Sequence, residues 1–341
     1  MNLLITSAGR RGYIVEYFKK VIGDDGKVYV GNSSSFSSAF SAADGCIVTP
    51  LIYDKEYIPF LLNFCESHCI DFLVSLFDVD LLILAQNKCK FAEAGTRVIV
   101  SSPEVVDRCN DKWKTYLFCQ KNKLHAAKAY LDLETALSAL EKKEISFPLI
   151  IKPRWGMGSL AVFTADNRAE LEVLYSKCKR EIEKSYLKYE AAIDWERCVI
   201  IQQKLAGSEY GIDIINDLDG NYCSNVVRKK YAMRSGETDC AAVVKSEVIS
   251  NFAEKLGKLS KHIGNLDVDV FVNEDEIYLL EMNARFGGGY PFSHIAGVDL
   301  PTAIIKWLKG ERVTDELIVK EYGRIIQKNI TFVDLTEYTK S

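Results

Sequence analysis

The chain has 341 residues and a mass of 38.4 kDa, which is too long for one ordinary single-core domain and fits two or three packed domains. It carries 43 Lys and Arg residues against 47 Asp and Glu residues, so its formal net charge is only −4 and gives no reason to expect a nucleic-acid partner. Hydrophobic residues make up 48% of the chain and charged residues 26%, as in folded globular proteins and unlike disordered ones.

The first hundred residues alternate between short apolar segments, which are typical of buried strands, and segments with helical spacing. This alternation predicts a parallel sheet with helices on both faces, ending near residues 101–103. The predicted strands cover residues 3–6, 28–31, 72–75 and 98–100, and the predicted helices cover residues 13–21, 59–69 and 81–91.

The rest of the chain mixes helices with strands of antiparallel type. Helical patterns over residues 107–122 and 135–142 precede a buried strand that opens at Pro148, and a glycine-bearing turn then leads to a strand over 160–163, which predicts a hairpin with a mobile tip. The later predicted elements are a long polar helix over 169–189, strands over 198–202, 210–215 and 223–227, a helix over 251–263, and a strand pair over 267–272 and 277–282 around a turn at 273–275. The segment 318–338 could add further strands.

No sequence feature points to secretion or to a membrane. The N-terminal apolar run is too short for a signal peptide, and basic residues follow it instead of preceding it. No apolar stretch approaches the roughly 20 residues of a membrane-spanning helix. The ten scattered cysteines are therefore expected to be reduced thiols in a cytoplasmic protein. Cys65, His68 and Cys69 lie close together, but no second ligand pair follows at zinc spacing, so helix packing is favoured.

The first candidate site is the turn Ser7-Ala8-Gly9-Arg10-Arg11-Gly12, between the first predicted strand and helix. A helix N-terminus offers free N–H groups and a partial positive charge, which suit an anion. A dinucleotide site would need a glycine in place of Ser7 and an acid after the second strand, where Gly31 and Asn32 stand. A tight connection is therefore favoured, with a substrate carboxylate on the helix end as the alternative.

The second candidate is the hairpin turn that contains Lys152, Gly156, Gly158 and Ser159. Glycines let the backbone come close to an anion, a flexible tip can close over a ligand, and a lysine supplies a point charge for phosphate. The Gly-Lys-Ser/Thr triplet of a P-loop is missing from the turn. A plain surface hairpin is the alternative.

The third candidate is the strand pair near the C-terminal third. Asp267 and Asp269 share one face of the first strand, and Glu281 and Asn283 share one face of the second. If the two faces coincide, these side chains form a hard-cation site of the magnesium type, whose shell substrate phosphates would complete. A solvated hairpin edge is the alternative, but it fits Glu281 poorly because apolar residues precede it and an unpartnered buried carboxylate is costly.

In their order and spacing these motifs resemble the ATP-grasp superfamily, and within it the carboxylate–amine ligases related to the carbamoyl-phosphate synthase large subunit. The resemblance covers roughly residues 1–310. It rests on residues 4–11, on Asn110-Asp111-Lys112, on the strand that ends in Lys152, on residues 207–213 and on Glu281-Met282-Asn283-Ala284-Arg285.

The resemblance implies a chain of α/β and α+β class with three domains. These are a Rossmann-like parallel sheet, or pre-ATP-grasp domain, over residues 1–105, an ATP-grasp N-lobe with a glycine-rich flap over 106–195, and a C-lobe with the metal and substrate sites over 196–341.

The resemblance also implies a role for each matching residue. ATP binding would fall to Lys112, Lys152, Gly156, Gly158, Ser159, Gln203, Lys204, Leu205 and Glu209. Magnesium (Mg2+, with Mn2+ as the alternative) would be held by Asp269, Glu281 and Asn283. Many relatives carry a longer side chain at the first of these three positions, so Asp269 could act through water. Family members often have an acid at the position of Gln203. A contact of this residue with the adenine amino group is therefore less strongly implied for this chain.

Three arginines are the predicted catalytic residues. Arg285 matches the family arginine near the transferred phosphoryl group, and Arg228 and Arg234 are expected to bind an anion, whereas Lys229 and Lys230 are expected to be exposed. The predicted substrate pocket contains Ser7, Gly9, Arg10, Asp78 and Gly288. Asp78, like Asp80, could equally cap the helix that follows it.

The implied reaction is an ATP-dependent ligation. A carboxylate attacks the γ-phosphate of ATP to give an acyl phosphate, and an amine then displaces phosphate and forms an amide or peptide bond, with ADP and phosphate as products. The expected partners are therefore a small-molecule carboxylate and a small-molecule amine, with no nucleic acid and no membrane, and a homodimer is left open. One alternative is an ATP-binding regulatory or scaffold module without catalysis, and a dehydrogenase is a more distant one.

Overall fold

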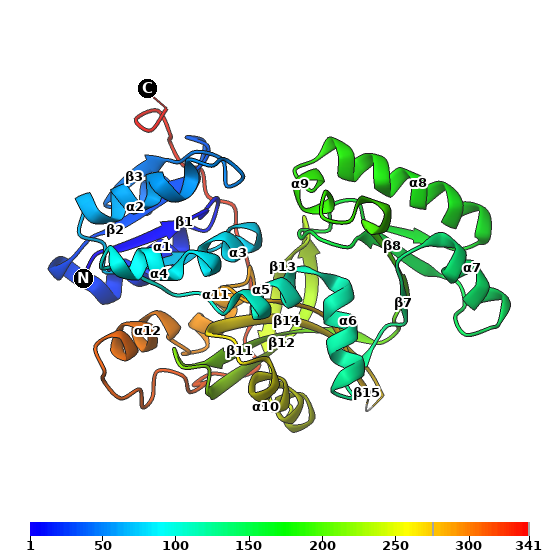
Figure 1. Ribbon diagram of the computed structural model, residues 1–341. Helices are drawn as coiled ribbons and strands as arrows, with labels where there is room; N and C mark the ends of the chain where they lie inside the picture. The colour runs from blue at the N-terminus through cyan, green and yellow to red at the C-terminus, as the bar shows by residue number, and fades with distance from the viewer. Residues whose placement is uncertain (275, 340–341) are drawn as a thin grey trace.

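The computed structural model describes residues 1–274 and 276–339, and three sheets organise them (Figure 1). Asp275, which the sequence places in a turn, lies outside the described residues. The N-terminal sheet has five strands, the second sheet four and the third seven. The predicted fold class is confirmed, because a parallel sheet opens the chain and mixed α and β elements follow it.

The N-terminal sheet has the strand order β3-β2-β1-β4-β5, and all its strand pairs are parallel. Its strands are β1 (Leu3–Thr6), β2 (Val28–Asn32), β3 (Gly45–Val48), β4 (Phe72–Ser75) and β5 (Arg97–Val98), and its helices are α1 (Gly12–Ile22), α2 (Tyr57–Ser67), α3 (Asp78–Gln86) and α4 (Lys88–Glu93). Successive residues of β1 serve opposite faces: Leu3 and Ile5 pack with α1, and Leu4 packs with α2 and α3. Helices therefore cover both faces, as predicted. Strand β3 was not predicted, and two helices, α3 and α4, stand in place of the single helix predicted over 81–91.

The second sheet is antiparallel and has the order β7-β10-β8-β9. Its strands are β7 (Ala129–Tyr130), β8 (Leu149–Pro153), β9 (Phe163–Ala165) and β10 (Val199–Gln203), and the helices of this part are α7 (Leu133–Glu141), α8 (Arg168–Lys184) and α9 (Lys188–Ala191). The predicted hairpin is confirmed as β8 and β9. Its second strand begins only at Phe163, because Ser159 and Ala161 in the turn have positive φ angles that interrupt a strand.

The third sheet has the order β16-β13-β12-β11-β14-β15-β6. Its strands are β6 (His125–Ala126), β11 (Ser208–Asn216), β12 (Tyr222–Arg234), β13 (Glu237–Val243), β14 (Gly264–Asn273), β15 (Glu276–Asn283) and β16 (Ile325–Gln327). Helix α10 (Glu247–Ser260) covers one face, where Ala253 and Leu256 pack against Ile212 and Leu266. The predicted strand over 223–227 is too short, since β12 continues through the basic run that follows.

Two helix pairs join the sheets. Helices α5 (Pro103–Asn110) and α6 (Lys112–Lys121) replace the single helix predicted over 107–122 and pack on the third sheet through Cys109 and Cys119. Helices α11 (Tyr290–Ile295) and α12 (Leu300–Leu308) share one core with α1 of the N-terminal domain, so the C-terminal third of the chain returns to the first domain (Figure 1).

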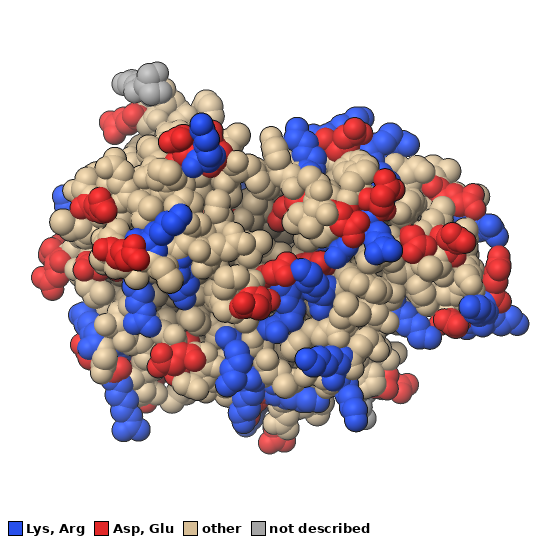
Figure 2. Space-filling model, viewed as in Figure 1, with Lys and Arg blue, Asp and Glu red and all other residues tan. Residues whose placement is uncertain are grey.

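The surface carries charges of both signs. On the face shown in Figure 2, basic and acidic side chains are interspersed, as the balanced composition predicts. Among residues 1–274 and 276–339, no helix is both long enough and apolar enough to cross a bilayer.

Candidate functional site

A cavity of about 410 Å³ is lined by residues from both the second and the third sheet. Its volume lies in the usual range of small-molecule sites. All nine residues that the sequence assigns to ATP line this one cavity, together with two of the three predicted metal ligands, namely Lys112, Lys152, Gly156, Gly158, Ser159, Gln203, Lys204, Leu205, Glu209, Asp269 and Glu281. The fold thus brings together residues that are up to 169 positions apart, from 112 to 281.

Part of the cavity wall is apolar. Ile150, Leu160, Val162, Phe271 and Leu280 all contribute to its lining. Flat apolar walls suit a planar aromatic ring such as a nucleobase, whose edges then seek hydrogen bonds from the lining backbone. The side chain of Gln203 is already engaged, because its amide nitrogen donates to the carbonyl of Ser146 at 2.9 Å and its amide oxygen accepts from the Ser146 N–H at 2.9 Å.

Two lysines reach the cavity from different elements. Lys152 sits at the end of β8 with only 6% of its surface exposed, and burial, together with the nearby Lys112, lowers its pKa to about 8, although Glu281 opposes the shift. Lys112 opens α6 and donates from Nζ to the carbonyl of Gly156 at 2.5 Å. A buried ammonium without its own carboxylate partner is suited to an incoming phosphate.

A buried ion pair that the sequence analysis missed positions these lysines. Arg154 follows β8 and donates to both carboxylate oxygens of Asp111, from Nε at 2.9 Å and from Nη2 at 2.7 Å. Asp111 also accepts from the backbone N–H of Trp113 and so caps α6. The pair therefore ties the start of α6 to the end of β8. The preference of aspartate for the N-cap position is the one signal that could have revealed it.

The glycine-rich turn of the hairpin packs closely at two points. Gly156 has a φ of +125°, and a Cβ atom there would lie 2.9 Å from the side chain of Leu187. At the tip, the backbone of Gly158 touches Gly236, in the turn between β12 and β13, so closely that a Cβ on Gly236 would lie 2.5 Å from it. Only glycine allows these approaches, and the turn lies over the cavity as a flap resting on the third sheet.

The two acidic strand faces coincide, which is the condition on which the predicted cation site depends. In the antiparallel pair β14 and β15, Asp267 stands opposite Asn283 and Asp269 opposite Glu281, and residues in directly opposite positions share a face. The pKa of Asp269 is raised to about 7, mainly by burial; Lys230 opposes the shift, and Asp267 and Glu281 contribute to it. Negative charge is thus crowded on this face, as expected where a cation binds.

The donor set of this face fits magnesium. Glu281 and Asn283 are half-buried and offer carboxylate and amide oxygens, which Mg²⁺ prefers. Within the two described segments no group of three or more His, Cys, Asp or Glu side chains could enclose a metal ion. An open oxygen set of this kind suits an ion whose remaining ligands are phosphate oxygens and water.

The prediction that Lys230 is exposed is wrong. Its side chain is 5% exposed, and Nζ lies 2.6 Å from Glu209 and 2.7 Å from Asp269. Burial alone would lower its pKa, but these two carboxylates outweigh burial and raise the pKa above its usual range. The lysine thus links Glu209, a predicted ATP-binding residue, to Asp269, a predicted metal ligand.

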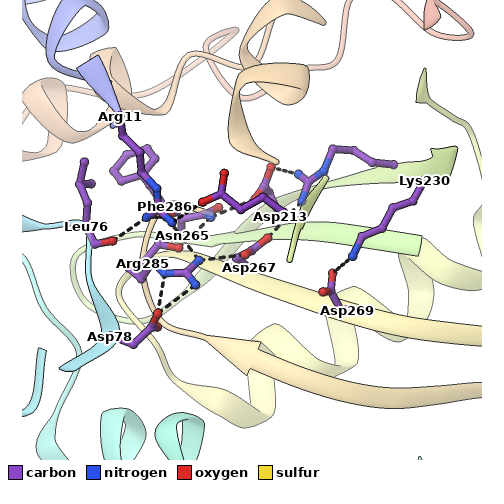
Figure 3. Close-up of polar contacts among 12 residues, drawn as sticks. Arg11, Leu76, Asp78, Asp213, Lys230, Asn265, Asp267, Asp269, Arg285 and Phe286 are labelled. Carbon is purple, nitrogen blue, oxygen red and sulfur yellow. Dashed lines mark hydrogen bonds and ion pairs between the residues drawn. The ribbon is translucent and has the colours of Figure 1, made fainter. Parts of the chain in front are cut away.

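Beyond the metal face, Arg285 and Arg228 belong to a buried network of ion pairs (Figure 3). Arg285 lies 3.0 Å from Asp78 and 2.9 Å from Asp267, and Arg228 lies 3.2 Å from Asp267 and pairs with the fully buried Asp213. Burial would raise the pKa of Asp267, but Arg285 and Arg228 outweigh it and lower the pKa. Both arginines thus have carboxylate partners within the protein, and their catalytic roles stay predictions.

The alternative of helix capping is wrong for both aspartates at the start of α3. Phe77 is the N-cap residue and α3 has no side-chain cap. Asp78 instead pairs with Arg285, and Asp80 accepts hydrogen bonds from the hydroxyls of Thr6 and Ser75 at 2.5 and 2.7 Å. Long-range partners therefore take both carboxylates away from the helix end.

The glycine triplet after β15 packs against charged side chains. A Cβ on Gly287 would lie 2.1 Å from the carboxyl carbon of Asp267, and one on Gly289 would lie 2.8 Å from the guanidinium of Arg228. Gly288, a predicted substrate residue, would similarly meet the carboxyl group of Glu237 at 2.8 Å. The triplet leaves room for the ion-pair network, and its contact with substrate stays a prediction.

In the N-terminal turn, the predicted substrate residue Arg10 and its neighbour Arg11 differ in their contacts, and the role of Arg10 stays a prediction. Arg10 is exposed, whereas Arg11 donates to the carbonyl of Leu76 at 2.6 Å and pairs with Glu237 at 3.2 Å. Ser7 donates to Asp80 at 3.2 Å, so the turn is also held by internal contacts. The turn lies at the carboxyl end of β1, where the strand order of the sheet reverses and ligands of α/β sheets are usually found. Substrate binding by Ser7 and Gly9 stays a prediction.

Arg234 lies apart from the other predicted catalytic residues. Its side chain is 49% exposed and pairs with Asp239 at 3.0 Å, near the end of the β12–β13 hairpin. The lining of the two cavities described for this chain does not include it.

Comparisons with known proteins agree with this geometry. Residues 3–99 match the family of PylC-like N-terminal domains, and residues 196–331 match the family described as ATP-grasp in the biosynthetic pathway with Ter operon. Among solved structures, the chain is similar to a biotin carboxylase complex from Campylobacter jejuni with β,γ-ATP, at 17% identity and a TM-score of 0.73 over 92% of this chain and 72% of the other.

Two further structures are similar. One is the L-amino acid ligase from Bacillus licheniformis, at 20% identity and a TM-score of 0.70 over 90% of this chain and 75% of the other. The other is the biotin carboxylase domain dimer of the 2-oxoglutarate carboxylase from Hydrogenobacter thermophilus with MgADP, ADP and bicarbonate, at 15% identity and a TM-score of 0.73 over 95% and 73%.

These similarities confirm the predicted superfamily. Solved structures of this fold hold ATP analogues, ADP and magnesium, so the expectation of ATP and Mg²⁺ is confirmed for the fold. The chain therefore has the ATP-grasp fold, with a match to an ATP-grasp family over residues 196–331 and a match to the PylC-like N-terminal domain family over residues 3–99.

Proposed function

We propose that this protein is an ATP-dependent carboxylate–amine ligase that forms an amide or peptide bond and releases ADP and phosphate. The observation that carries the proposal is the shared cavity, in which the buried Lys152 faces the same space as Asp269 and Glu281. A lysine that can bind phosphate and two carboxylates that can bind a metal ion line one cavity of small-molecule size. This combination suits the transfer of a phosphoryl group. The ATP-grasp family match supports the same reading.

In this proposal, each group of residues has one task. Lys112 and Lys152 bind the phosphates of ATP, and the flap of Gly156 and Gly158 covers them and keeps water from the acyl phosphate. The substrate carboxylate oxygen forms a bond to the γ-phosphorus, and the bond to the β-phosphate oxygen breaks. The neutral amine nitrogen then bonds to the acyl carbon, the bond between that carbon and the phosphate oxygen breaks, and the proton that the nitrogen loses goes to the leaving phosphate.

Magnesium, held by Glu281 and Asn283 with Asp269 nearby, would supply positive charge that offsets the charge of the phosphates. Lys152 lines the same cavity as Asp269 and Glu281, so the buried ammonium and a bound magnesium would both offset phosphate charge there. The substrates are small molecules, and a homodimer is a further proposal. We also propose the division into domains 1–105, 106–195 and 196–341, with the qualification that α5 and α6 pack on the third sheet.

The test is the substitution Glu281→Gln. Phosphate release from Mg·ATP, screened against pairs of carboxylates and amines, should fall about 10²–10³-fold, because one preorganised charge is removed from the reaction centre. The melting temperature should stay the same or rise, since the substitution relieves repulsion between Glu281 and Asp269.

Glu276→Gln is the matched control, because Glu276 lies on the same strand and is exposed. It should leave phosphate release unchanged. Phosphate release by Glu281→Gln at the wild-type rate would contradict the proposed reaction centre. Binding of an ATP analogue without turnover for any substrate pair would favour the regulatory or scaffold module.

A further inference from the structure

The second sheet has a hydrophobic core of its own. Among the residues that the structure describes, its two core clusters draw only on positions between 113 and 201. By contrast, the N-terminal sheet and the third sheet share one core, to which Val30 and Val226 both belong. Parts of a chain with separate cores can move relative to each other, whereas a shared core holds its parts together. The second sheet with its helices, called here the second-sheet lobe (residues 129–203), is therefore the part that can move.

Two aromatic pairs join this lobe to the N-terminal domain, and their four rings are called here the aromatic latch. Tyr53, in the loop between β3 and α2, stacks on Tyr189 of α9, with ring centroids 4.2 Å apart and ring planes at 24°. Phe77, just before α3, has its ring 6.1 Å from that of Tyr186, just before α9. Tyr53 and Tyr189 are 40% and 46% exposed, so their stack can separate without opening a buried core.

The helix that carries Tyr189 also packs against the base of the flap. Leu187, one residue before α9, is buried and lies so close to Gly156 that a Cβ there would be 2.9 Å from its side chain. Beyond α9, Asp194 accepts from Arg154 Nη1 at 3.0 Å, and Arg154 leads directly into the glycine-rich turn. Because close-packed side chains transmit a displacement, a movement of α9 must carry the flap with it.

The same movement would widen the predicted nucleotide cavity. The cavity lies between Lys152 of the second-sheet lobe and Glu281 of the third sheet, and the flap tip at Gly158 touches Gly236 of the third sheet. Helix α9 is the part of the lobe that faces the N-terminal domain (Figure 1). Since the N-terminal sheet and the third sheet share a core, a lobe that leaves one of them also leaves the other. Separation of the aromatic latch and opening of the cavity are therefore one event.

We propose that the aromatic latch sets the rate of nucleotide release. Tyr53 and Phe77 are positioning residues of the N-terminal domain that hold α9, and through it the flap, closed over a bound nucleotide. None of the four rings lines the nucleotide cavity, so the latch acts without touching the ligand. The proposal rests on the nucleotide site of the proposed function and adds to it a contact with the N-terminal domain.

Nucleotide dissociation is the direct test. A fluorescent, non-hydrolysable ATP analogue is bound to the full chain with magnesium and then displaced by an excess of the unlabelled analogue in a stopped-flow instrument. Tyr53→Ser and Tyr189→Ser should each raise the dissociation rate about three- to tenfold, which corresponds to the loss of one aromatic contact. The double variant should match the single ones, because either substitution removes the same stack. The association rate should not fall, since the lining of the cavity is unchanged.

Two kinds of control accompany the serine variants. Tyr53→Phe and Tyr189→Phe keep the stacked ring and should release the analogue at the wild-type rate, as should Tyr322→Ser, which removes a tyrosine that is 53% exposed and lies outside the latch. Melting temperatures show that each variant is folded. Wild-type dissociation rates in both folded serine variants would overturn the proposal. So would a fall in their association rate, which indicates damage to the cavity, or an equal acceleration in Tyr53→Phe, which indicates an effect of the hydroxyl group.

The outcomes separate this inference from the proposed function. If the analogue binds and the serine variants release it at the wild-type rate, only the latch fails. If the serine variants release it faster but no pair of carboxylate and amine yields phosphate, the latch stands and the ligase reaction fails. If the wild type does not bind the analogue at all, both proposals fail.

Discussion

The buried ammonium of Lys152 predicts a specific pH dependence of nucleotide binding. Burial is the main cause that lowers its pKa to about 8, with a further contribution from Lys112. Below this pH the side chain is charged and binds phosphate, and above it the free protein carries a neutral amine. The terminal phosphate, with its last pKa near 6 by analogy with phosphorylated side chains, is already ionised throughout this range. Affinity should therefore fall as the pH rises through 8.

The magnitude follows from the protonated fraction of the free protein. With a pKa of about 8, the amine is about nine-tenths protonated at pH 7 and about one-tenth protonated at pH 9, so the Kd should rise roughly tenfold, or about 1.4 kcal/mol, between these pH values. The assay is a calorimetric titration with a non-hydrolysable ATP analogue at saturating magnesium and fixed ionic strength, at several pH values between 7 and 9.5.

Two lysine-to-arginine variants make this test decisive. Lys152→Arg should bind the analogue with a nearly constant Kd, because a guanidinium stays charged over the whole range. Lys204→Arg, on the lining of the same cavity, should keep the wild-type pH dependence. Two results would refute the reasoning. One is a wild-type Kd that stays constant up to pH 9.5, and the other is a tenfold rise of Kd between pH 7 and 9 that persists in Lys152→Arg.

Two other predictions concern stability. Arg228→Met leaves Asp213 as a buried, unpaired charge and should lower the free energy of unfolding by about 3–5 kcal/mol, and addition of Asp213→Asn should restore much of the loss. Urea denaturation measures both, and a loss below about 1 kcal/mol would show that the pair is not structural. Burial lowers the pKa of His262 to about 4, below the usual 6.5, so the unfolded chain binds more protons between these values. The free energy of unfolding should fall by up to roughly 3 kcal/mol as the pH drops from about 6.5 to 4. Urea titrations at each pH measure it, and His262→Gln should lack this part of the pH dependence. An identical pH dependence in both proteins would contradict the prediction.

The parts of the fold that the sequence predicts well depend on local patterns. Strands β1 and β4 are continuous apolar runs, as buried parallel strands usually are, and their helices follow at once. The face shared by Asp269 and Glu281 was predictable for a similar reason. A short turn fixes the register of a hairpin, and register fixes which side chains stand opposite each other.

The parts that the sequence predicts poorly depend on partners far along the chain. Arg228 and Lys230 belong to a basic run, which usually marks a solvated surface, and nothing beside them indicates burial. Their carboxylate partners stand on β11 and β14, at Asp213, Glu209 and Asp269. Alternation along β12 places both cations on one face, and only the strand order brings that face to the acids.

The ion pairs of Arg285 make the face of the predicted metal ligands dependent on the N-terminal part of the chain. Arg285 follows β15 by two residues and pairs with Asp267 on β14 and with Asp78 on α3. Because a buried charge that loses its partner is costly, any change that moves α3 must also move Arg285 or Asp267. Asp267 shares its face with Asn283, so such a movement reaches the predicted metal ligands. Helix α3 of the N-terminal part therefore contributes to the geometry of the predicted nucleotide cavity, although no residue before Lys112 lines that cavity.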